Sequence, residues 1–522
     1  MKSLLKKNKD YIFGGLYGSS GSYIAKAIYD DYKNTIILLN NNSEIYNLAE
    51  ELKLFFSDNQ SINMYIDYES LPYEKIITDN EINSERIKTY KNIINNDKNV
   101  ILTTYASIIK RIIPLEDLEK NYFDITVKST YKDVISIIES SGYQRCNQVY
   151  SKGEFSIRGP IIDIFTMTAN KPIRIVFDHD KPIIKEFDID TQKSTKLIKS
   201  FIISNTHEIK LTDKLIDNYK KLAANIFDDE YFNDIEFEKI SNKIHCPTIN
   251  NILPLLYEST SLFLEMFDPD ESIVLTSKPI MPQINKIKDD YDIYYDKLNS
   301  QKFILSPKYL LSDENTIKNI LNNITTIELS SFKSDEINSI NATIQKLPSI
   351  IINNTYKDPY INLKKFIQSN TKKILFCIQR KTLRNELSKI LDQIEVKYIE
   401  VDNYDGFVSN KYQYQICDKR ISEGFIDYKK NIVLIADRDI FGPRAIAIPK
   451  KQVKKNLIDD YINDISALEI DSPIVHDNYG VGRYKGLINM DVEGINTELI
   501  KIEYADKDIL YIPVFSINLL KK

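Results

Sequence analysis

The hydrophobic pattern of residues 1–122 alternates between strand-sized apolar runs and helical spacing. The runs at 35–39 (TIILL) and 99–105 (NVILTTY) have the length of buried strands. Residues 22–32 and 81–95 space their apolar side chains as amphipathic helices do. Strands that alternate with helices predict an α/β module whose parallel sheet is covered by helices.

The pattern changes after this module. Residues 130–143 form one amphipathic helix, and short alternating segments follow, separated by Gly, Pro and Asp. Alternation with a period of two between turn residues is typical of antiparallel strands. We therefore expect an inserted α+β domain at 123–208. The α/β module then resumes at 209–340, with a buried strand at 272–276 (SIVLT) and a charged connector helix.

The remainder predicts two more domains. Residues 341–448 read as a small α/β domain, because strand-like runs at 372–378 and 396–401 flank an amphipathic helix. A basic linker helix is expected at 449–468. In 469–522, about five short strands joined by Gly and Asp turns are enough to close a small β-barrel.

Composition adds little chemistry. The 522 residues are 43% hydrophobic and 27% charged, with a net charge of −5, as in ordinary soluble proteins. No apolar run could span a bilayer, and the N-terminus lacks the features of a signal peptide. A short basic run, Pro449–Lys455, reads as a solvated linker. The acidic total gives no independent support for DNA binding, and non-specific contact with double-stranded DNA stays open.

The four cysteines are far apart in the sequence, without the spacing of a zinc site or a disulfide framework: Cys146, Cys246, Cys377 and Cys417. We therefore expect no metal site, and a reducing cytoplasm as the location.

A glycine-rich stretch, GGLYGSSGSYIAKAI from residue 14, has the strand–turn–helix layout of a phosphate-binding loop. The motif G-x-x-x-x-G-K-[ST] requires a second glycine and a lysine, but Ser20 and Gly21 occupy those positions. Lys26 lies more than one turn into the helix, although Ser22 could supply the hydroxyl. We therefore expect no nucleotide and no catalytic residue at this degenerate loop, which comprises Gly15, Gly18, Ser20, Gly21 and Ser22.

The most specific motifs lie near the C-terminus, in SPIVHDNYGVGRYKGL and YADKDILYIPV. They resemble the RNA-polymerase-interaction domain of the transcription-repair coupling factor family (Mfd). CarD-type regulators share a looser version, and Tyr479 replaces the usual His. The matching positions are Pro473, Val475, His476, Gly480, Gly482, Arg483, Tyr484, Gly486, Tyr504, Ala505, Asp508, Leu510, Tyr511, Pro513 and Val514.

The resemblance extends over nearly the whole chain. The glycine-rich stretch resembles the family's degenerate loop, whereas the excision-repair helicase UvrB keeps a working one. LPYE at 71–74 with Arg86 resembles another family motif. GEFSIRGPIIDIF and PIRIVFDHD resemble the insert that UvrB and the coupling factor both carry.

The resemblance implies two partner-binding sites. In the insert, Arg158, Arg174 and Phe177 correspond to the residues that dock on UvrA. An intradomain salt bridge of either arginine with Asp163 or Asp178 is the open alternative. In the terminal barrel, the family binds the β subunit of RNA polymerase. The corresponding apolar positions, for which a core role stays the alternative, are Met490, Leu487, Ile495 and Leu499.

The implied function is transcription-coupled nucleotide excision repair. The complete family is an ATP-dependent DNA translocase that displaces stalled polymerase, but its ATP- and magnesium-binding motor motifs are absent from these 522 residues. The sequence is therefore either a piece of a longer protein or a reduced one, and whether it is an enzyme stays open. A CarD-like regulator without a repair role and a UvrB-like ATPase are the alternatives.

Overall fold

The chain divides into two compact units, Met1–Pro443 and Arg444–Lys522, and each is described by itself. The predicted linker helix at 449–468, with its run Pro449–Lys455, lies outside the described residues. Within those residues, no helix is long and apolar enough to cross a membrane. The structure is a computed structural model that describes residues 9–56, 62–68, 73, 80–95, 98–178, 181–227, 229–246, 248–298, 303–353, 355–442, 470–476, 480–492, 495–504, 509–513 and 520–521.

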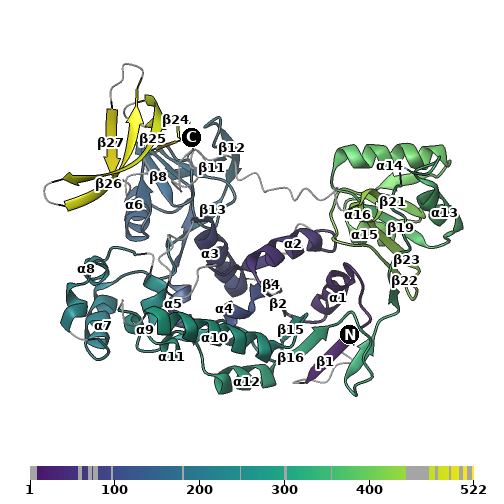
Figure 1. Cartoon of the computed structure of the whole chain (residues 1–522), viewed down its shortest axis with the longest axis horizontal. Coiled ribbons are helices and arrows are strands. Elements are labelled where there is room, and N and C mark those ends of the chain that lie inside the picture. The colour runs from purple at the N-terminus through teal and green to yellow at the C-terminus, as the bar shows by residue number, and fades with distance from the viewer. Residues whose placement is uncertain are drawn as a thin grey trace. The chain divides into compact units, whose positions relative to one another are not determined.

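A seven-stranded parallel sheet forms the centre of the first unit, in the order β17-β1-β16-β15-β2-β4-β3 (Figure 1). Two of the runs predicted as buried strands are β2 and β4, neighbours in this sheet whose backbones pair in register from Asn34 opposite Asn99. The strands are β1 (Asp10–Gly14), β2 (Asn34–Leu39), β3 (Ile62–Tyr65), β4 (Asn99–Thr104), β15 (Ser272–Thr276), β16 (Thr325–Leu329) and β17 (Ser339–Asn341).

Helices surround this sheet and extend into a helical region after the insert. The apolar spacing of ASIIKRII (106–113) predicts a helix up to Pro114, and this is wrong in detail: the helix ends at Ile109, and Arg111–Ile112 form β5, which pairs with β14 (Ser261–Leu262). A run of β-branched isoleucines favours extended backbone there. The helices are α1 (Ser20–Tyr29), α2 (Asn42–Leu52), α3 (Asn80–Asn95), α4 (Tyr105–Ile109), α5 (Leu115–Glu119), α7 (Asp213–Ala223), η1 (Asp229–Asn233), α8 (Ile235–Ser241), η2 (Ile249–Ile252), α9 (Leu253–Leu256), η3 (Phe263–Met266), α10 (Ile280–Leu298), α11 (Pro307–Leu310) and α12 (Glu314–Asn323).

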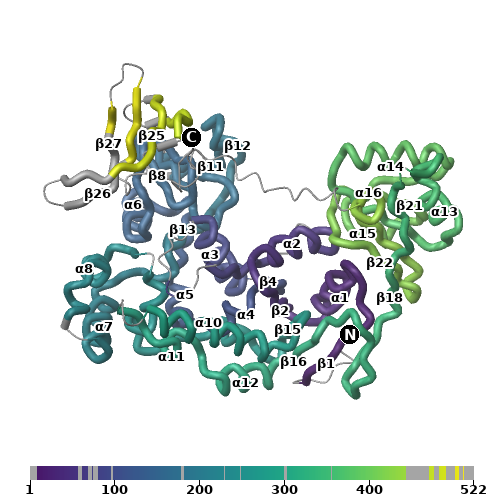
Figure 2. The backbone as a smooth tube through the Cα atoms, viewed as in Figure 1, coloured from purple at the N-terminus to yellow at the C-terminus, as the bar shows by residue number. Residues whose placement is uncertain are grey.

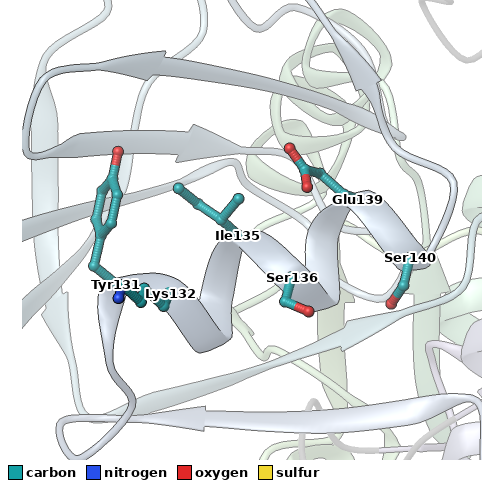
Figure 3. Close-up of a pocket in the computed structure, with 6 residues that line it drawn as sticks. All are labelled: Tyr131, Lys132, Ile135, Ser136, Glu139 and Ser140. Carbon is teal, nitrogen blue, oxygen red and sulfur yellow. The ribbon is translucent and has the colours of Figure 1, made fainter.

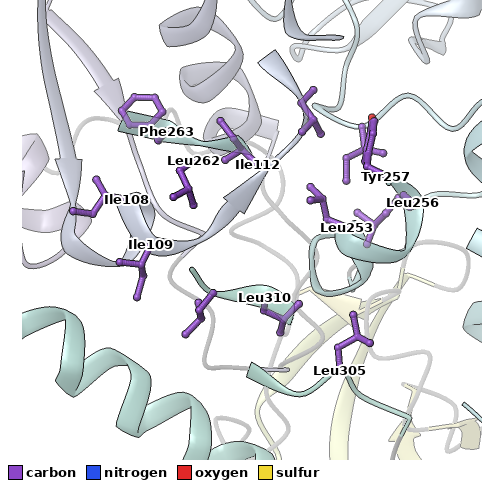
Figure 4. Packing of buried hydrophobic residues seen from close by; sticks show 14 of the residues in the cluster. Ile108, Ile109, Ile112, Leu253, Leu256, Tyr257, Leu262, Phe263, Leu305 and Leu310 are labelled. Carbon is purple, nitrogen blue, oxygen red and sulfur yellow. The ribbon is translucent and has the colours of Figure 1, made fainter. Parts of the chain in front are cut away.

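The largest hydrophobic core joins the two halves of the module across the insert. Figure 4 shows Ile108 and Ile109 from before the insert together with Leu253, Phe263 and Leu310 from after it. These side chains are at most 7% exposed. Burial of this apolar surface, about 25 cal/mol per Å², is what holds the split module together.

The insert begins and ends on neighbouring strands. β6 (Tyr122–Thr126) pairs antiparallel with β13 (Ser200–Ser204), so the chain leaves and returns at one place. Between them lie α6 (Tyr131–Ser140), which starts at a capping box of Thr130 and Asp133, and a six-stranded sheet. Its strands are β7 (Gln144–Arg145), β8 (Glu154–Arg158), β9 (Ile161–Ile164), β10 (Ile173–Asp178), β11 (Lys181–Phe187) and β12 (Ser194–Ile198).

A second α/β domain follows within the first unit. This domain is the green part of the tube in Figure 2, where α13, α14, α15 and α16 are labelled. Its six-stranded sheet has the order β18-β22-β23-β19-β21-β20, in which β23, β19, β21 and β20 are parallel. Its elements are β18 (Ile344–Gln345), α13 (Ile361–Ser369), β19 (Lys373–Cys377), α14 (Lys381–Gln393), β20 (Tyr398–Glu400), α15 (Tyr404–Ser409), β21 (Tyr414–Cys417), β22 (Phe425–Asp427), β23 (Ile432–Ala436) and α16 (Asp437–Phe441).

The described strands of the second unit form an antiparallel sheet, as the turn-separated runs of 469–522 predict, and closure of this sheet into a barrel stays a prediction. Its described strands have the order β27-β26-β25-β24-β28. Gly486, with φ of +99°, lies at the register shift of β25, where glycine's backbone freedom is needed. The strands are β24 (Pro473–His476), β25 (Gly480–Val492), β26 (Ile495–Glu503), β27 (Ile509–Pro513) and β28 (Leu520–Lys521).

Candidate partner-binding sites and the glycine-rich loop

The glycine-rich loop connects β1 to α1, as the sequence predicted, but several of its backbone donors are engaged within the chain. Gly15 N–H donates to Phe332 O (3.2 Å), and Leu16 N–H to Ser330 O (3.0 Å). Ser19 N–H donates to Glu423 O (2.9 Å). A phosphate-binding loop leaves such groups pointing at its ligand.

Hydroxyl groups of the loop donate hydrogen bonds to a carboxylate of the chain itself. Ser19 Oγ donates to Glu51 Oε2 (2.8 Å), and Ser22 Oγ donates to Glu51 Oε1. Ser422 N–H, from the connection after β21, donates to the same carboxylate (2.8 Å). Glu51 is only 7% exposed, and these donors provide hydrogen bonds to its buried oxygens. A phosphate bound here would face this carboxylate and be repelled by it.

The loop also joins the first sheet to the second α/β domain. Gly18 has φ of +49°, and a Cβ built on it would lie 2.6 Å from Glu423 O. The ring of Tyr23 on α1 lies 5.8 Å from that of Phe425 at a tilt of 35°, and Tyr404 N–H donates to Leu54 O (2.8 Å). We call the contacts of Gly18, Ser19, Ser22 and Glu51 with 422–424 the loop joint. The prediction that no nucleotide binds stays a prediction, and the loop joint supplies a physical reason for it.

The two arginines of the insert bind one buried carboxylate. Arg174 donates from Nε to Asp163 Oδ1 (2.6 Å) and from Nη2 to Oδ2 (2.9 Å), which raises its pKa. Arg158 donates from Nη2 to the same Oδ2. Asp163 is 1% exposed, Arg174 16% and Arg158 52%. The intradomain salt bridge that the sequence left open is therefore present for both arginines. About half of the Arg158 side chain is still exposed to solvent.

Phe177 faces the core of the insert. It is 8% exposed, and its ring lies 5.2 Å from that of Tyr131 in an edge-on arrangement. Successive residues of a strand point to opposite faces, so Val176 is on the same face as Arg174 and Phe177 on the other. The role of Phe177 in partner contact stays a prediction, and its ring offers little surface for it here.

A row of side chains that are exposed at its ends and half-buried between them crosses the sheet beside Arg158. Cross-strand pairs place Arg158 opposite Ile161, Ile161 opposite Val176, and Val176 opposite Ile183. Directly paired residues share one face, and Ile183 is 42% exposed. We call these four residues the outer row. It combines an arginine with contiguous apolar surface, as interface centres do.

A pocket on α6 begins next to the turn after Arg158. Tyr131, its first lining residue, donates from its hydroxyl to Gly159 O (3.2 Å) and so fixes that turn. Figure 3 shows Tyr131 and Ile135 projecting from one side of the helix. The pocket is lined by Tyr131, Lys132, Ile135, Ser136, Glu139 and Ser140.

The predicted polymerase-binding residues lie on the long hairpin of the second unit. Leu487 on β25 is 38% exposed. The backbone of Met490 pairs with Thr497 and that of Val492 with Ile495, on β25 and β26. The side chains of Met490, Ile495 and Leu499 lie outside the described part of the structure, and their roles stay predictions.

An ion pair that the sequence did not predict fixes the insert to the module. Arg86 on α3 donates to both oxygens of Glu208, which follows β13 where the chain leaves the insert. Both side chains are at most 7% exposed. Burial would lower the pKa of Arg86, but the charge of Glu208 raises it. Arg86 had been identified only through a family motif, which gave no hint of its partner.

No group of His, Cys, Asp and Glu in the described ranges has the arrangement of a metal site. Cys377 and Cys417 are paired in register on β19 and β21, and burial raises the pKa of the Cys377 thiol. Buried thiols of this kind are inert.

Three family models match the chain. The UvrB interaction domain matches residues 124–208, the MFD D3 domain residues 366–440, and the CarD-like/TRCF RID domain residues 468–522. The first covers the strands that carry Arg158, and the second covers the domain that contributes Ser422 to the loop joint.

Curated relatives match along nearly the whole chain, and they are named transcription-repair-coupling factors. The protein of Haemophilus influenzae is 25% identical over 477 residues, 89% of this chain and 41% of the relative. That of Escherichia coli is 22% identical over 99% of this chain and 45% of its own length. That of Borreliella burgdorferi is 24% identical over 100% and 44%. The resemblance is confirmed, and the chain spans less than half the length of these relatives.

Proposed function

Because the chain carries the UvrB interaction, D3 and CarD-like domains of the transcription-repair-coupling factors, we propose that it serves transcription-coupled excision repair by linking RNA polymerase to UvrA. Linking works by effective concentration: a partner held near the polymerase binds there as an intramolecular event. This mode of action needs two docking surfaces and no nucleotide chemistry in these residues.

The observation that carries the proposal is the geometry around Asp163. Its buried carboxylate forms an ion pair with Arg174 and accepts a hydrogen bond from one nitrogen of Arg158. The half-exposed side chain of Arg158 is therefore held in place. Arginine is enriched at interface hot spots because its planar fork forms paired hydrogen bonds to carboxylates. The outer row supplies the neighbouring apolar surface. We assign UvrA to this surface.

RNA polymerase is the proposed partner of Arg444–Lys522. The CarD-like domain match supports this, and β27 lies at the end of the order of described strands, where a partner strand can add. Leu487 gives exposed apolar surface on the adjoining hairpin. The alternative of a UvrB-like ATPase has less support, since Glu51 occupies the hydroxyl groups that would serve a nucleotide.

UvrA binding by Arg158→Glu tests the insert surface. We expect its affinity for UvrA to fall about 30-fold or more, the scale of a hot spot, because the reversed charge also faces Asp163. Arg145→Glu is the matched control: Arg145 is exposed on β7 of the same domain, and the change in charge is identical. Calorimetric titration measures both. If both variants bind UvrA with the affinity of the unchanged chain, the surface around Arg158 does not bind UvrA.

A further inference from the structure

Three connections meet at one edge of the second α/β domain. Residues 428–431, 370–372 and 410–413 lead into the neighbouring parallel strands β23, β19 and β21. Lys373 N–H donates to Asn431 O (3.2 Å), and Ile374 N–H donates to Gln413 O (2.7 Å). Segments far apart in the sequence are therefore side by side at the amino ends of these strands.

The side chains at this edge are basic and aromatic. We call Lys372, Lys411, Lys429 and Lys430 the lysine edge. None of the residues in the three connections is acidic. Lys411, Lys429 and Lys430 are exposed. Tyr412 and Tyr428, which lie between the lysines, are each 49% exposed.

Internal contacts hold the lysine edge in place. Asp427, which is 5% exposed, accepts the N–H groups of Lys429 (2.9 Å) and Lys430 (3.1 Å), so its carboxylate fixes the hairpin turn from inside. Gln413 Nε2 donates to Asn370 O (2.8 Å) and thereby ties two connections together. A charged surface whose backbone is fixed loses less entropy on binding than a mobile one.

Lys373 belongs to this fixed framework. Its Nζ donates to Val408 O (3.0 Å) and to Asn410 O, at the end of α15. It therefore points into the domain's own carbonyl groups and is not counted in the lysine edge.

We propose that the lysine edge binds the phosphodiester backbone of duplex DNA. Its charge comes from lysine alone, which is depleted at protein–protein interfaces, whereas lysine and arginine both neutralise DNA phosphates. Three strands at a spacing of about 4.8 Å extend the edge over roughly 10 Å. One DNA strand carries a charge every ~3.4 Å of helix axis, so the edge faces about three phosphates.

The arrangement of Tyr428 favours the duplex over a single strand. Lys372 Nζ lies 4.5 Å from the centre of the Tyr428 ring and covers one of its faces. Proteins that bind single strands stack bases on open aromatic faces. With one face covered, the half-exposed Tyr428 offers less surface for stacking, and its phenol is a hydrogen-bond donor that suits a phosphate oxygen. This inference goes beyond the linking function, because it gives the chain a hold on DNA that needs neither partner.

The test is the affinity of the whole chain for a fluorescein-labelled duplex of mixed sequence, measured by anisotropy between about 50 and 200 mM salt. The variant changes Lys372, Lys411, Lys429 and Lys430 to Gln. We expect at least ~10-fold weaker binding at the lowest salt, and a slope of log K against log salt that is smaller by about 3.

The matched control changes four lysines on another surface. Lys214, Lys220, Lys221 and Lys239 are exposed on α7 and α8, among acidic neighbours, and their change to Gln removes the same charge. The control should bind DNA within about twofold of the unchanged chain, because phosphates are repelled by that mixed surface. If the fourfold variant unfolds at a lower temperature than the unchanged chain, the duplex affinity of the double variant K429Q/K430Q, which changes only the exposed turn, is measured in its place.

Three results would overturn the proposal. The first would be that the unchanged chain does not bind the duplex at the lowest salt. The second would be that the lysine-edge variants bind the duplex as tightly as the control does. The third would be that these variants lose affinity for a single strand of the same sequence while their affinity for the duplex is unchanged. The last result would indicate base stacking by the tyrosines.

Discussion

Glu208→Gln is expected to lower the free energy of unfolding by about 3–5 kcal/mol, because it leaves the guanidinium of Arg86 buried without a counter-charge. Glu208 accepts from Arg86, and from the hydroxyl groups of Tyr68 (3.2 Å) and Tyr90 (3.5 Å). Arg86 also donates to Ile66 O (2.8 Å), so the guanidinium cannot turn to solvent without breaking the edge of the first sheet.

Urea unfolding followed by circular dichroism measures this effect, since the chain contains no tryptophan. Glu314→Gln is the matched control: it breaks the exposed pair with Lys318 (2.6 Å), and we expect its urea midpoint to stay close to that of the unchanged chain, because exposed pairs contribute little. Replacing both Arg86 and Glu208 by Met should cost less than Glu208→Gln alone, because no charge stays buried. If Glu208→Gln unfolds at the same urea concentration as Glu314→Gln, the pair does not hold the insert on the module.

Gly18→Val is expected to open the loop joint at a cost of about 2–5 kcal/mol. The first reason is the backbone, since φ of +49° is strained for a β-branched residue. The second is space: the Cβ would lie 2.6 Å from Glu423 O and 2.9 Å from Gly424 O, both of them backbone atoms. Overpacking of this kind adds about 1–3 kcal/mol.

Hydrogen exchange of residues 421–425 reports directly on this joint, because Ser422 and Glu423 N–H groups bind Glu51 and Ser19. Gly21→Ala is the control. Its Cβ would meet only Leu329 Cδ1, at 3.8 Å, and alanine is favoured over glycine in a helix by about 1 kcal/mol. Exchange should therefore rise in Gly18→Val and stay unchanged or slow in Gly21→Ala. Equal exchange in both would mean that the loop does not hold the second domain.

The sequence was sufficient for the elements whose signal is local. The neighbouring strands β2 and β4 are short apolar runs, and counting along the glycine-rich loop was enough to show that Gly21 occupies the position of the motif's lysine. The alternation of side chains along β10 also indicated which residues face the core, although the family motif groups Phe177 with the partner-binding arginines. Arg174 and Val176 fall on one face, whereas Ile175 and Phe177 fall on the other, where both are buried.

Features made by distant residues could not be predicted in this way. Glu51 reaches Ser19 and Ser422 only because α2 packs beside the loop and the second domain closes on it. Nothing in the local sequence pairs Arg86 with Glu208, 122 positions later. The lysine edge likewise exists because the strand order places β23, β19 and β21 together.

The most direct measurement of the central claim is the retention of UvrA on immobilised RNA polymerase. UvrA is added with the unchanged chain, with Arg158→Glu, with Arg145→Glu, or alone. The account predicts that UvrA stays on the polymerase with the unchanged chain and with Arg145→Glu, and is washed away with Arg158→Glu or without the chain. Retention of UvrA that is the same with and without the chain, or the same for Arg158→Glu and Arg145→Glu, would contradict it.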